Sequence, residues 1–179
     1  MFKIEDSIGL VIDIQERLMP FIYNRGELGK RAEIFIKGCR VLDLPVLAVQ
    51  QYTRGLGETV PVLKSALGEC DYIEKLTFSC CGCPEFIKKL EDSGRKNIII
   101  SGIEAHVCVQ QTVLDLLEAK YNIYVLADCT GSRSETDCAY ALGRMRDAGA
   151  VITTTESVLF ELLVRADHPK RKDISNLVK

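Results

Sequence analysis

The chain has 179 residues, of which 47% are hydrophobic and 27% are charged, and 23 Lys and Arg against 25 Asp and Glu give a net charge of −2. This length predicts one compact domain over residues 1–179, and the hydrophobic fraction excludes a disordered chain. Because there is no basic excess, we expect no nucleic-acid partner. Because no apolar run approaches the roughly 18 residues that span a bilayer, we expect no membrane partner.

Eight cysteines raise the question of disulfide bonds. The first residues, MFKIEDSIGLVIDIQ, place acidic residues in and beside a short apolar run, which is not the pattern of a signal peptide. A chain of this size can also bury a full core without covalent staples. We therefore expect a cytoplasmic protein with reduced thiols.

Five short runs rich in Val, Ile or Leu predict strands that are buried on both faces. In chain order, these runs are 8–13, 45–50, 97–101, 122–127 and 150–153. Stretches with helical spacing of apolar residues lie between them, at 28–39, 109–117 and 138–145. The alternation predicts a three-layer, Rossmann-like α/β fold, with a mostly parallel sheet of about six strands and helices on both faces. The stretch 53–84 shows neither pattern and is expected to be a long loop.

In such a sheet the ligand crevice lies beyond the carboxyl ends of the strands. Asp13 ends the first run, and Cys108 lies where the turn after 97–101 enters a helix. The N–H groups at a helix start are expected to stabilise a thiolate and to hold an oxyanion beside it. Asp13 could take the thiol proton in a dry pocket beside a cation, and Lys75 is a candidate cation. His106 is a base by type, but it lies only two residues from Cys108.

The motifs that contain these residues resemble the isochorismatase-like cysteine hydrolases, a superfamily that includes nicotinamidases and N-carbamoylsarcosine amidohydrolases. The resemblance rests on Asp13 with Gln15, on Lys75 before 77–79, and on 102–109, all in family order. It is strongest to the isochorismatase domain-containing subgroup. It implies a triad in which Asp13 is the general base, Cys108 the nucleophile and Lys75 the cation that tunes both.

The resemblance also implies a cis peptide bond between Ile103 and Glu104, with the backbone N–H groups of Glu104 and Cys108 aimed at the oxyanion. The implied reaction is attack on a small amide or carbamoyl substrate through a covalent thiol intermediate. The stretch 50–57 lacks the Asp and His of the nicotinamidase metal cluster, so we expect no metal, and no organic cofactor is implied.

Further expectations concern the pocket and the assembly. A homo-oligomer is expected, as in relatives, because the segment 160–163 offers apolar surface. The residues expected to line the substrate pocket are Gln15, Gln51, Tyr52, Phe78 and His106.

Several other interpretations stay open. The protein could hydrolyse a vinyl ether, as isochorismatase does, without a thiol nucleophile. It could be a thiol redox or zinc protein that uses Cys80 and Cys83, which have the spacing of a ligand pair. It could also be a binding protein that retains the pocket. Taken one at a time, Cys108 could be a buried hydrophobe, Asp13 a turn-capping acid and Lys75 a solvated lysine.

Overall fold

A computed structural model describes residues 3–179 and places one six-stranded sheet at their centre. All strand pairs are parallel, and the strand order is β3-β2-β1-β4-β5-β6. The strands are β1 (Ser7–Ile12), β2 (Val46–Gln51), β3 (Ile73–Lys75), β4 (Asn97–Ile103), β5 (Asn122–Gly131) and β6 (Val151–Thr153). The predicted three-layer α/β fold is confirmed.

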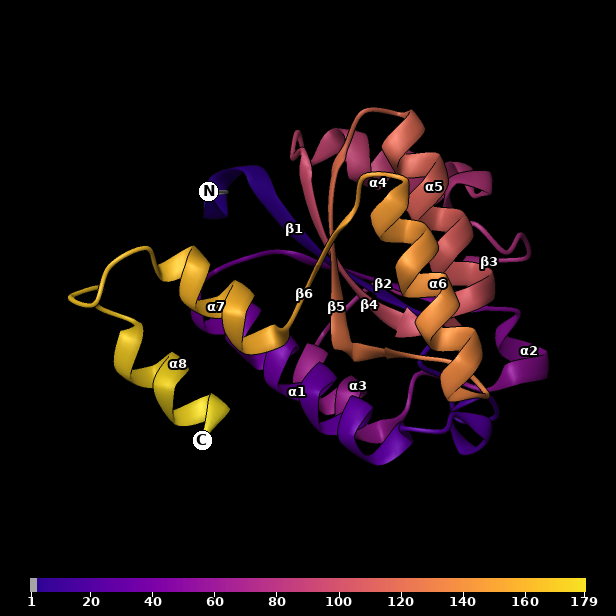
Figure 1. Ribbon diagram of the computed structural model, residues 1–179, viewed down its shortest axis with the longest axis horizontal. Helices are drawn as coiled ribbons and strands as arrows, with labels where there is room; N and C mark the ends of the chain where they lie inside the picture. Colours follow the sequence, from indigo (N-terminus) through magenta and orange to yellow (C-terminus); the bar gives the residue numbers. More distant parts are fainter. Residues whose placement is uncertain (1–2) are drawn as a thin grey trace.

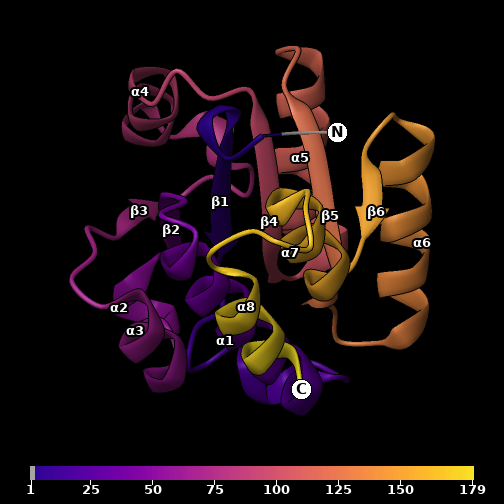
Figure 2. The same cartoon turned by 90° about the vertical axis from the view of Figure 1, so that its left-hand side faces the viewer.

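Helices cover both faces of the sheet (Figure 1). One layer holds α1 (Arg25–Val41), α3 (Pro61–Leu67), α7 (Thr155–Leu163) and α8 (Arg171–Val178). The other layer holds α4 (Pro84–Asp92), α5 (Gln110–Glu118) and α6 (Glu135–Asp147). A short helix, α2 (Thr53–Leu56), follows β2. Figure 2 looks onto the first layer, with α7 and α8 in front of the sheet.

The apolar runs form strands because each one can bury both of its faces. Side chains alternate across a strand, so Val11 joins the core beneath α1, whereas Leu10 and Ile12 join the core beneath α5. Phe35 of α1 and Val113 of α5 are fully buried in these two cores. The sheet is therefore a rigid support for the residues beyond its carboxyl edge.

The strand β3 lies within the stretch 53–84, for which a loop was expected, so that expectation was wrong. β3 has only three residues, and its exposed middle residue, Glu74, separates the buried Ile73 and Lys75. Such a short run gives no usable periodicity. Its register pairs Lys75 with Gln51, which places Lys75 at the carboxyl end of the sheet.

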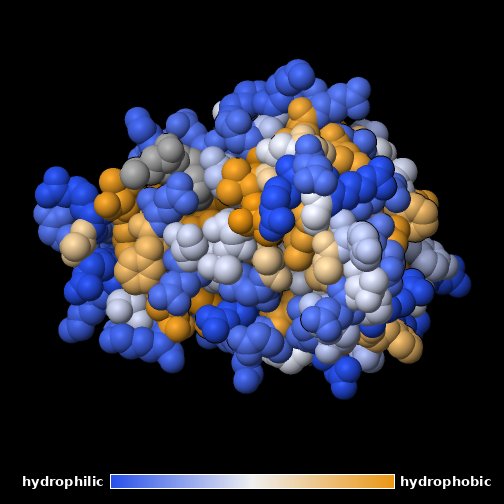
Figure 3. Space-filling view, in the orientation of Figure 1, coloured by the Kyte–Doolittle hydropathy of each residue, from blue (hydrophilic) through white to orange (hydrophobic). Residues whose placement is uncertain are grey.

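The apolar surface expected at 160–163 is mostly absent. Leu162 and Leu163 are buried because α7 packs against α1 and α8, and Phe160, at 38% exposure, is left partly open. On the face shown in Figure 3, hydrophobic residues are interspersed with hydrophilic ones. The homo-oligomer thus stays a prediction without this support. Within residues 3–179, every helix falls short of the length and apolar character that crossing a membrane requires.

Candidate active site

Three chemically distinct side chains meet beyond the carboxyl edge of the sheet. Asp13 follows β1, Lys75 ends β3, and Cys108 lies in a π-helical turn, Ala105–Val109, after β4. Gly102 allows β4 to approach β1 closely, because a Cβ atom there would lie 2.7 Å from the carbonyl oxygen of Ile12. A glycine is therefore required at position 102, where β1 and β4 approach closely and bring Asp13 and Cys108 near each other.

Asp13 and Lys75 form an ion pair that is closed to solvent. The Nζ atom of Lys75 lies 2.7 Å from Oδ2 of Asp13, and both side chains are 0% exposed. Asp13 has a φ angle of 56°, in the left-handed region that Asp tolerates better than most residues. This conformation turns the chain sharply at the end of β1.

The second oxygen of Asp13 is the atom best placed to act as a base. Oδ1 is buried and has no partner at hydrogen-bond geometry within residues 3–179. Burial raises the pKa of the Asp13 carboxyl, although the charge and hydrogen bond of Lys75 act in the opposite direction. Cys108 lies near enough that each of the two groups shifts the pKa of the other. The Asp13 carboxyl thus keeps one oxygen that Lys75 does not bind, and the Cys108 thiol lies close enough to interact with this carboxyl.

The surroundings of Cys108 favour the thiol over the thiolate. Burial raises its pKa to about 12; the charge of Asp13 adds to this rise, and Lys75 opposes it. The direction of this pKa shift runs against the expectation that the helix start would stabilise the thiolate. The helical turn begins at Ala105, so Cys108 lies inside it, and burial is the largest cause of its raised pKa, followed by the charge of Asp13.

The turn that precedes Cys108 has an unusual backbone. The peptide bond between Ile103 and Glu104 is cis, at the position that the family resemblance implies. The carbonyl oxygen of Glu104 accepts from the N–H groups of Val107 and Val109, at 3.0 and 3.4 Å. Its carboxylate forms a two-point ion pair with Arg133, an interaction that the sequence analysis did not find.

Two glutamines expected to line the pocket instead bind protein groups. Gln15 is fully buried, and its amide binds the backbone of Gln51 and the carbonyl of Gly57, at 2.6–3.0 Å. The Oε1 atom of Gln51 accepts from Lys75 Nζ at 2.6 Å. Both residues lie at the site, and each amide already has protein partners.

Three other expected lining residues are accessible. Tyr52 and Phe78 are about half exposed; Tyr52 directly follows β2, and Phe78 follows β3, the strand that Lys75 ends. His106 is half-buried, and its Nδ1 atom lies 2.9 Å from Oγ of the buried Ser132. These residues thus remain candidates for substrate contact.

An open cavity of about 310 Å³ lies beside Glu104. The residues that line it are Arg17, Leu18, Phe21, Leu56, Glu104 and Arg133. Arg17 and Leu18 were not predicted from the sequence as pocket residues, although Arg17 follows Asp13 by only four residues. The cavity is small and partly apolar, and charged groups of both signs line it, as expected of a pocket for a small polar molecule.

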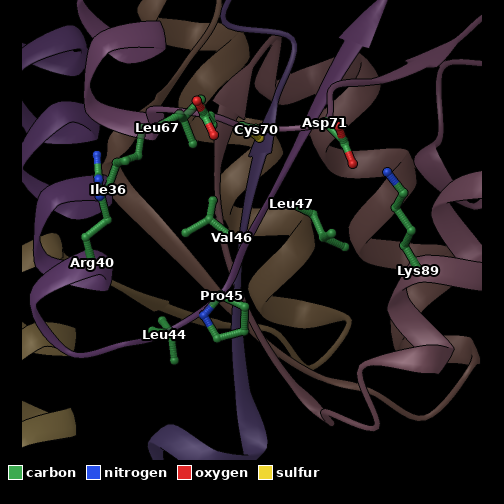
Figure 4. A pocket seen from close by; sticks show the side chains of 11 residues that line it. Ile36, Arg40, Leu44, Pro45, Val46, Leu47, Leu67, Cys70, Asp71 and Lys89 are labelled. Carbon is green, nitrogen blue, oxygen red and sulfur yellow. The ribbon is translucent and has the colours of Figure 1, made fainter.

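A larger cavity of about 470 Å³ lies at the opposite end of β2 (Figure 4). Arg40 and Lys89 stand on opposite sides of it, and Val46 and Leu47 lie between them. Its one thiol, Cys70, has a pKa raised by burial. This cavity lies away from the carboxylate, ammonium and thiol described above, so we do not place the reaction there.

The other thiols do not form an evident second centre. All eight cysteines are free. Cys80 is fully buried, and the Cys83 thiol donates to the carbonyl of Glu74 at 3.6 Å. Across residues 3–179, no three His, Cys, Asp or Glu residues are grouped so that they could hold a metal ion.

The protein is a three-layer α/β protein with a buried carboxylate, ammonium and thiol at the carboxyl edge of its sheet. The sequence model of the isochorismatase domain matches residues 7–157. The chain therefore belongs to the isochorismatase family.

Individual relatives agree with this assignment. The chain is 38% identical over 174 residues to isochorismatase domain-containing protein 1 of Danio rerio, covering 97% of this chain but only 61% of that protein. It is 36% identical to isochorismatase domain-containing protein 2 of Danio rerio, covering 96% of this chain and 86% of that protein. The structure of MAR1 ribonuclease from Caenorhabditis elegans has a TM-score of 0.94 at 38% identity, covering 99% of this chain and 91% of that one.

Proposed function

We propose that the protein is a cysteine hydrolase that cleaves a small amide or carbamoyl compound through a covalent intermediate on Cys108. The observation that carries this proposal is the free, buried Oδ1 atom of Asp13 beside the Cys108 thiol. A thiol with a pKa near 12 is a poor nucleophile unless a base takes its proton during attack. Asp13 is suited to this task because burial raises its own pKa towards that of a useful base.

In the first half of the reaction, the proton of Cys108 passes to Asp13 while sulfur bonds to the carbonyl carbon. The carbonyl electron pair moves onto oxygen, which the backbone N–H groups of Glu104 and Cys108 stabilise. When the carbonyl re-forms, the C–N bond breaks, and the leaving nitrogen takes the proton back from Asp13. Lys75 stabilises the charged form of Asp13 through its ion pair. The product of this half is a thioester on Cys108.

In the second half, water replaces the amine. The oxygen of the water attacks the thioester carbon while Asp13 takes a proton from this water. The C–S bond then breaks, the proton returns from Asp13 to sulfur, and the acid leaves. The ion pair with Lys75 keeps the Asp13 carboxylate in place through both halves.

The cavity beside Glu104 supports a small substrate. Its volume of about 310 Å³ lies at the lower end of the range for small-molecule sites. Leu18, Phe21 and Leu56 suit an apolar group, and the guanidinium group of Arg17 favours a polar or negatively charged one. Arg133 is already paired with the Glu104 carboxylate. Net charge of −2 gives no electrostatic support for a nucleic-acid substrate.

A substrate panel tests this proposal. Neutral amides, carboxylate-bearing amides, carbamoyl compounds and vinyl ethers are offered to wild type, to Cys108→Ser and to the control Cys81→Ser, which changes a half-buried thiol of the neighbouring turn. A short RNA belongs in the panel because the C. elegans relative is named a ribonuclease. We expect amide or carbamoyl hydrolysis that Cys108→Ser abolishes and Cys81→Ser retains. Hydrolysis confined to vinyl ethers or RNA, or hydrolysis that survives in Cys108→Ser, would contradict the proposal.

A further inference from the structure

We propose that Gln51 is a positioning residue, whose side-chain amide holds the Lys75 ammonium so that Oδ1 of Asp13 stays free for the Cys108 proton. This inference rests on the proposed function, because it gives a task to a residue that touches the same triad. Gln51 was expected to contact the substrate, but its amide points at Lys75.

The hydrogen bonds of Lys75 account for all three of its donors. Nζ donates to Oδ2 of Asp13 at 2.7 Å, to Oε1 of Gln51 at 2.6 Å and to the carbonyl of Thr77 at 3.2 Å. An ammonium group carries three N–H bonds, so these acceptors fix its orientation. If the amide of Gln51 were removed, one N–H would be left to turn towards the unpartnered Oδ1 of Asp13.

The amide of Gln51 is itself held in one orientation. Its Nε2 atom donates to the carbonyl of Leu76 at 3.0 Å, which leaves Oε1 to face Lys75. Its backbone is held separately, because its N–H donates to Gln15 and its carbonyl accepts from Gln15. A substitution of the Gln51 side chain therefore leaves the backbone anchor of this strand end intact.

The titratable groups around the Asp13–Lys75 pair come from three further segments. Glu104 follows β4, Cys108 lies in the π-helical turn, and Cys80 lies in the 3₁₀ turn Cys80–Gly82. The charge of Glu104 already raises the pKa of Asp13. A second carboxylate at position 51 would add to this effect and would compete with Asp13 for the ammonium.

Gln50 offers a matched control on the same strand. Its Oε1 atom accepts from the N–H and the hydroxyl of Thr59, at 2.7 and 3.2 Å. Successive side chains of a strand point to opposite faces, so Gln50 and Gln51 are directed differently. Gln50→Glu therefore adds the same charge one residue away, without a bond to Lys75.

The experiment follows the alkylation of Cys108 by iodoacetamide as a function of pH, with peptide mass spectrometry as the readout. Protonation of Asp13 slows alkylation at low pH, so the midpoint of this fall reports the pKa of Asp13. We expect Gln51→Glu to move the midpoint upward by about one pH unit and Gln50→Glu to move it by less than about 0.3. Equal shifts in the two variants, or none in Gln51→Glu, would overturn the inference.

A neutral variant keeps the inference testable if the added charge prevents folding. Gln51→Met should slow alkylation of Cys108 at neutral pH about tenfold, the effect of one lost hydrogen bond to a charged group. Its thermal midpoint should fall by only about 3–6 °C, the effect of one lost hydrogen bond to a charged group, because the backbone bonds to Gln15 remain. An unchanged alkylation rate would overturn the inference.

The same data separate this inference from the proposed function. If wild-type Cys108 shows no dependence on Asp13, the proposed proton transfer itself is wrong. If wild type behaves as proposed but the Gln51 variants match wild type, only the role of Gln51 is wrong.

Discussion

Replacement of Asp13 with Asn should change how the alkylation of Cys108 depends on pH. A lone thiol with a pKa of about 12 is ionised in about one molecule in 10⁵ at pH 7, and this fraction rises tenfold with each pH unit. If the proton instead passes to Asp13, it stays within the protein. The reactive fraction is then independent of pH between the midpoint of Asp13 and mildly alkaline pH.

In Asp13→Asn the internal acceptor is gone. The charge and hydrogen bond by which Asp13 raises the Cys108 pKa are also gone, so that pKa falls below about 12. Alkylation of Cys108 in this variant should rise about tenfold per pH unit from pH 7 to 9, as for any thiol below its pKa. The direction of the change at high pH is informative, because Asp13→Asn raises the fraction of Cys108 that is thiolate even though it removes the base.

The assay is iodoacetamide labelling at several pH values, with each cysteine-containing peptide quantified by mass spectrometry. Cys70 and Cys81 are partly exposed and serve as internal controls. Both should show the tenfold rise per pH unit in wild type and in Asp13→Asn. A wild-type Cys108 that rises with pH as steeply as Cys81 would refute the reasoning, because it would show that its proton goes to solvent.

Two further substitutions test the construction of the site. Lys75→Met should lower the free energy of unfolding in urea by about 3–5 kcal/mol, because it leaves the Asp13 carboxylate buried without its partner. The double variant Lys75→Met with Asp13→Asn should recover most of the lost free energy of unfolding. No recovery would argue against a charge effect. Gly102→Ala should cost about 1–3 kcal/mol and slow Cys108 alkylation, because its methyl group would press on the Ile12 carbonyl. The control Gly143→Ala, in a helix with open space around it, should gain up to about 1 kcal/mol, and equal effects at the two glycines would contradict the account.

The sequence predicts the sheet well because its strands are buried on both faces. Runs such as 97–101 cannot be read as amphipathic helices, and the turn that follows them must lie at the carboxyl edge. This logic brings Asp13 and Cys108 together before any coordinates are known. The same reasoning does not place Lys75 at the site, because the three-residue strand that contains Lys75 has no periodic pattern. Family resemblance alone indicates its position.

The electrostatics and the glutamine contacts could not be predicted from the sequence. The position of Cys108 near a helix start suggests a stabilised thiolate, yet the outcome depends on burial and on the distance to Asp13. Gln15 and Gln51 are polar residues near the site, which suggests contact with substrate. The Gln15 amide instead donates to the carbonyl of Gly57, and the Gln51 amide accepts from Lys75. These partners depend on the path of the chain through residues 51–57.

The central claim is that Cys108 carries a covalent intermediate. Its most direct test is mass spectrometry of protein quenched in acid during turnover of the best amide from the panel. The account predicts an added mass equal to the acyl group, located on the peptide that contains Cys108, and no such mass in Cys108→Ser. Turnover without any adduct on Cys108, together with continued turnover in Cys108→Ser, would contradict the account.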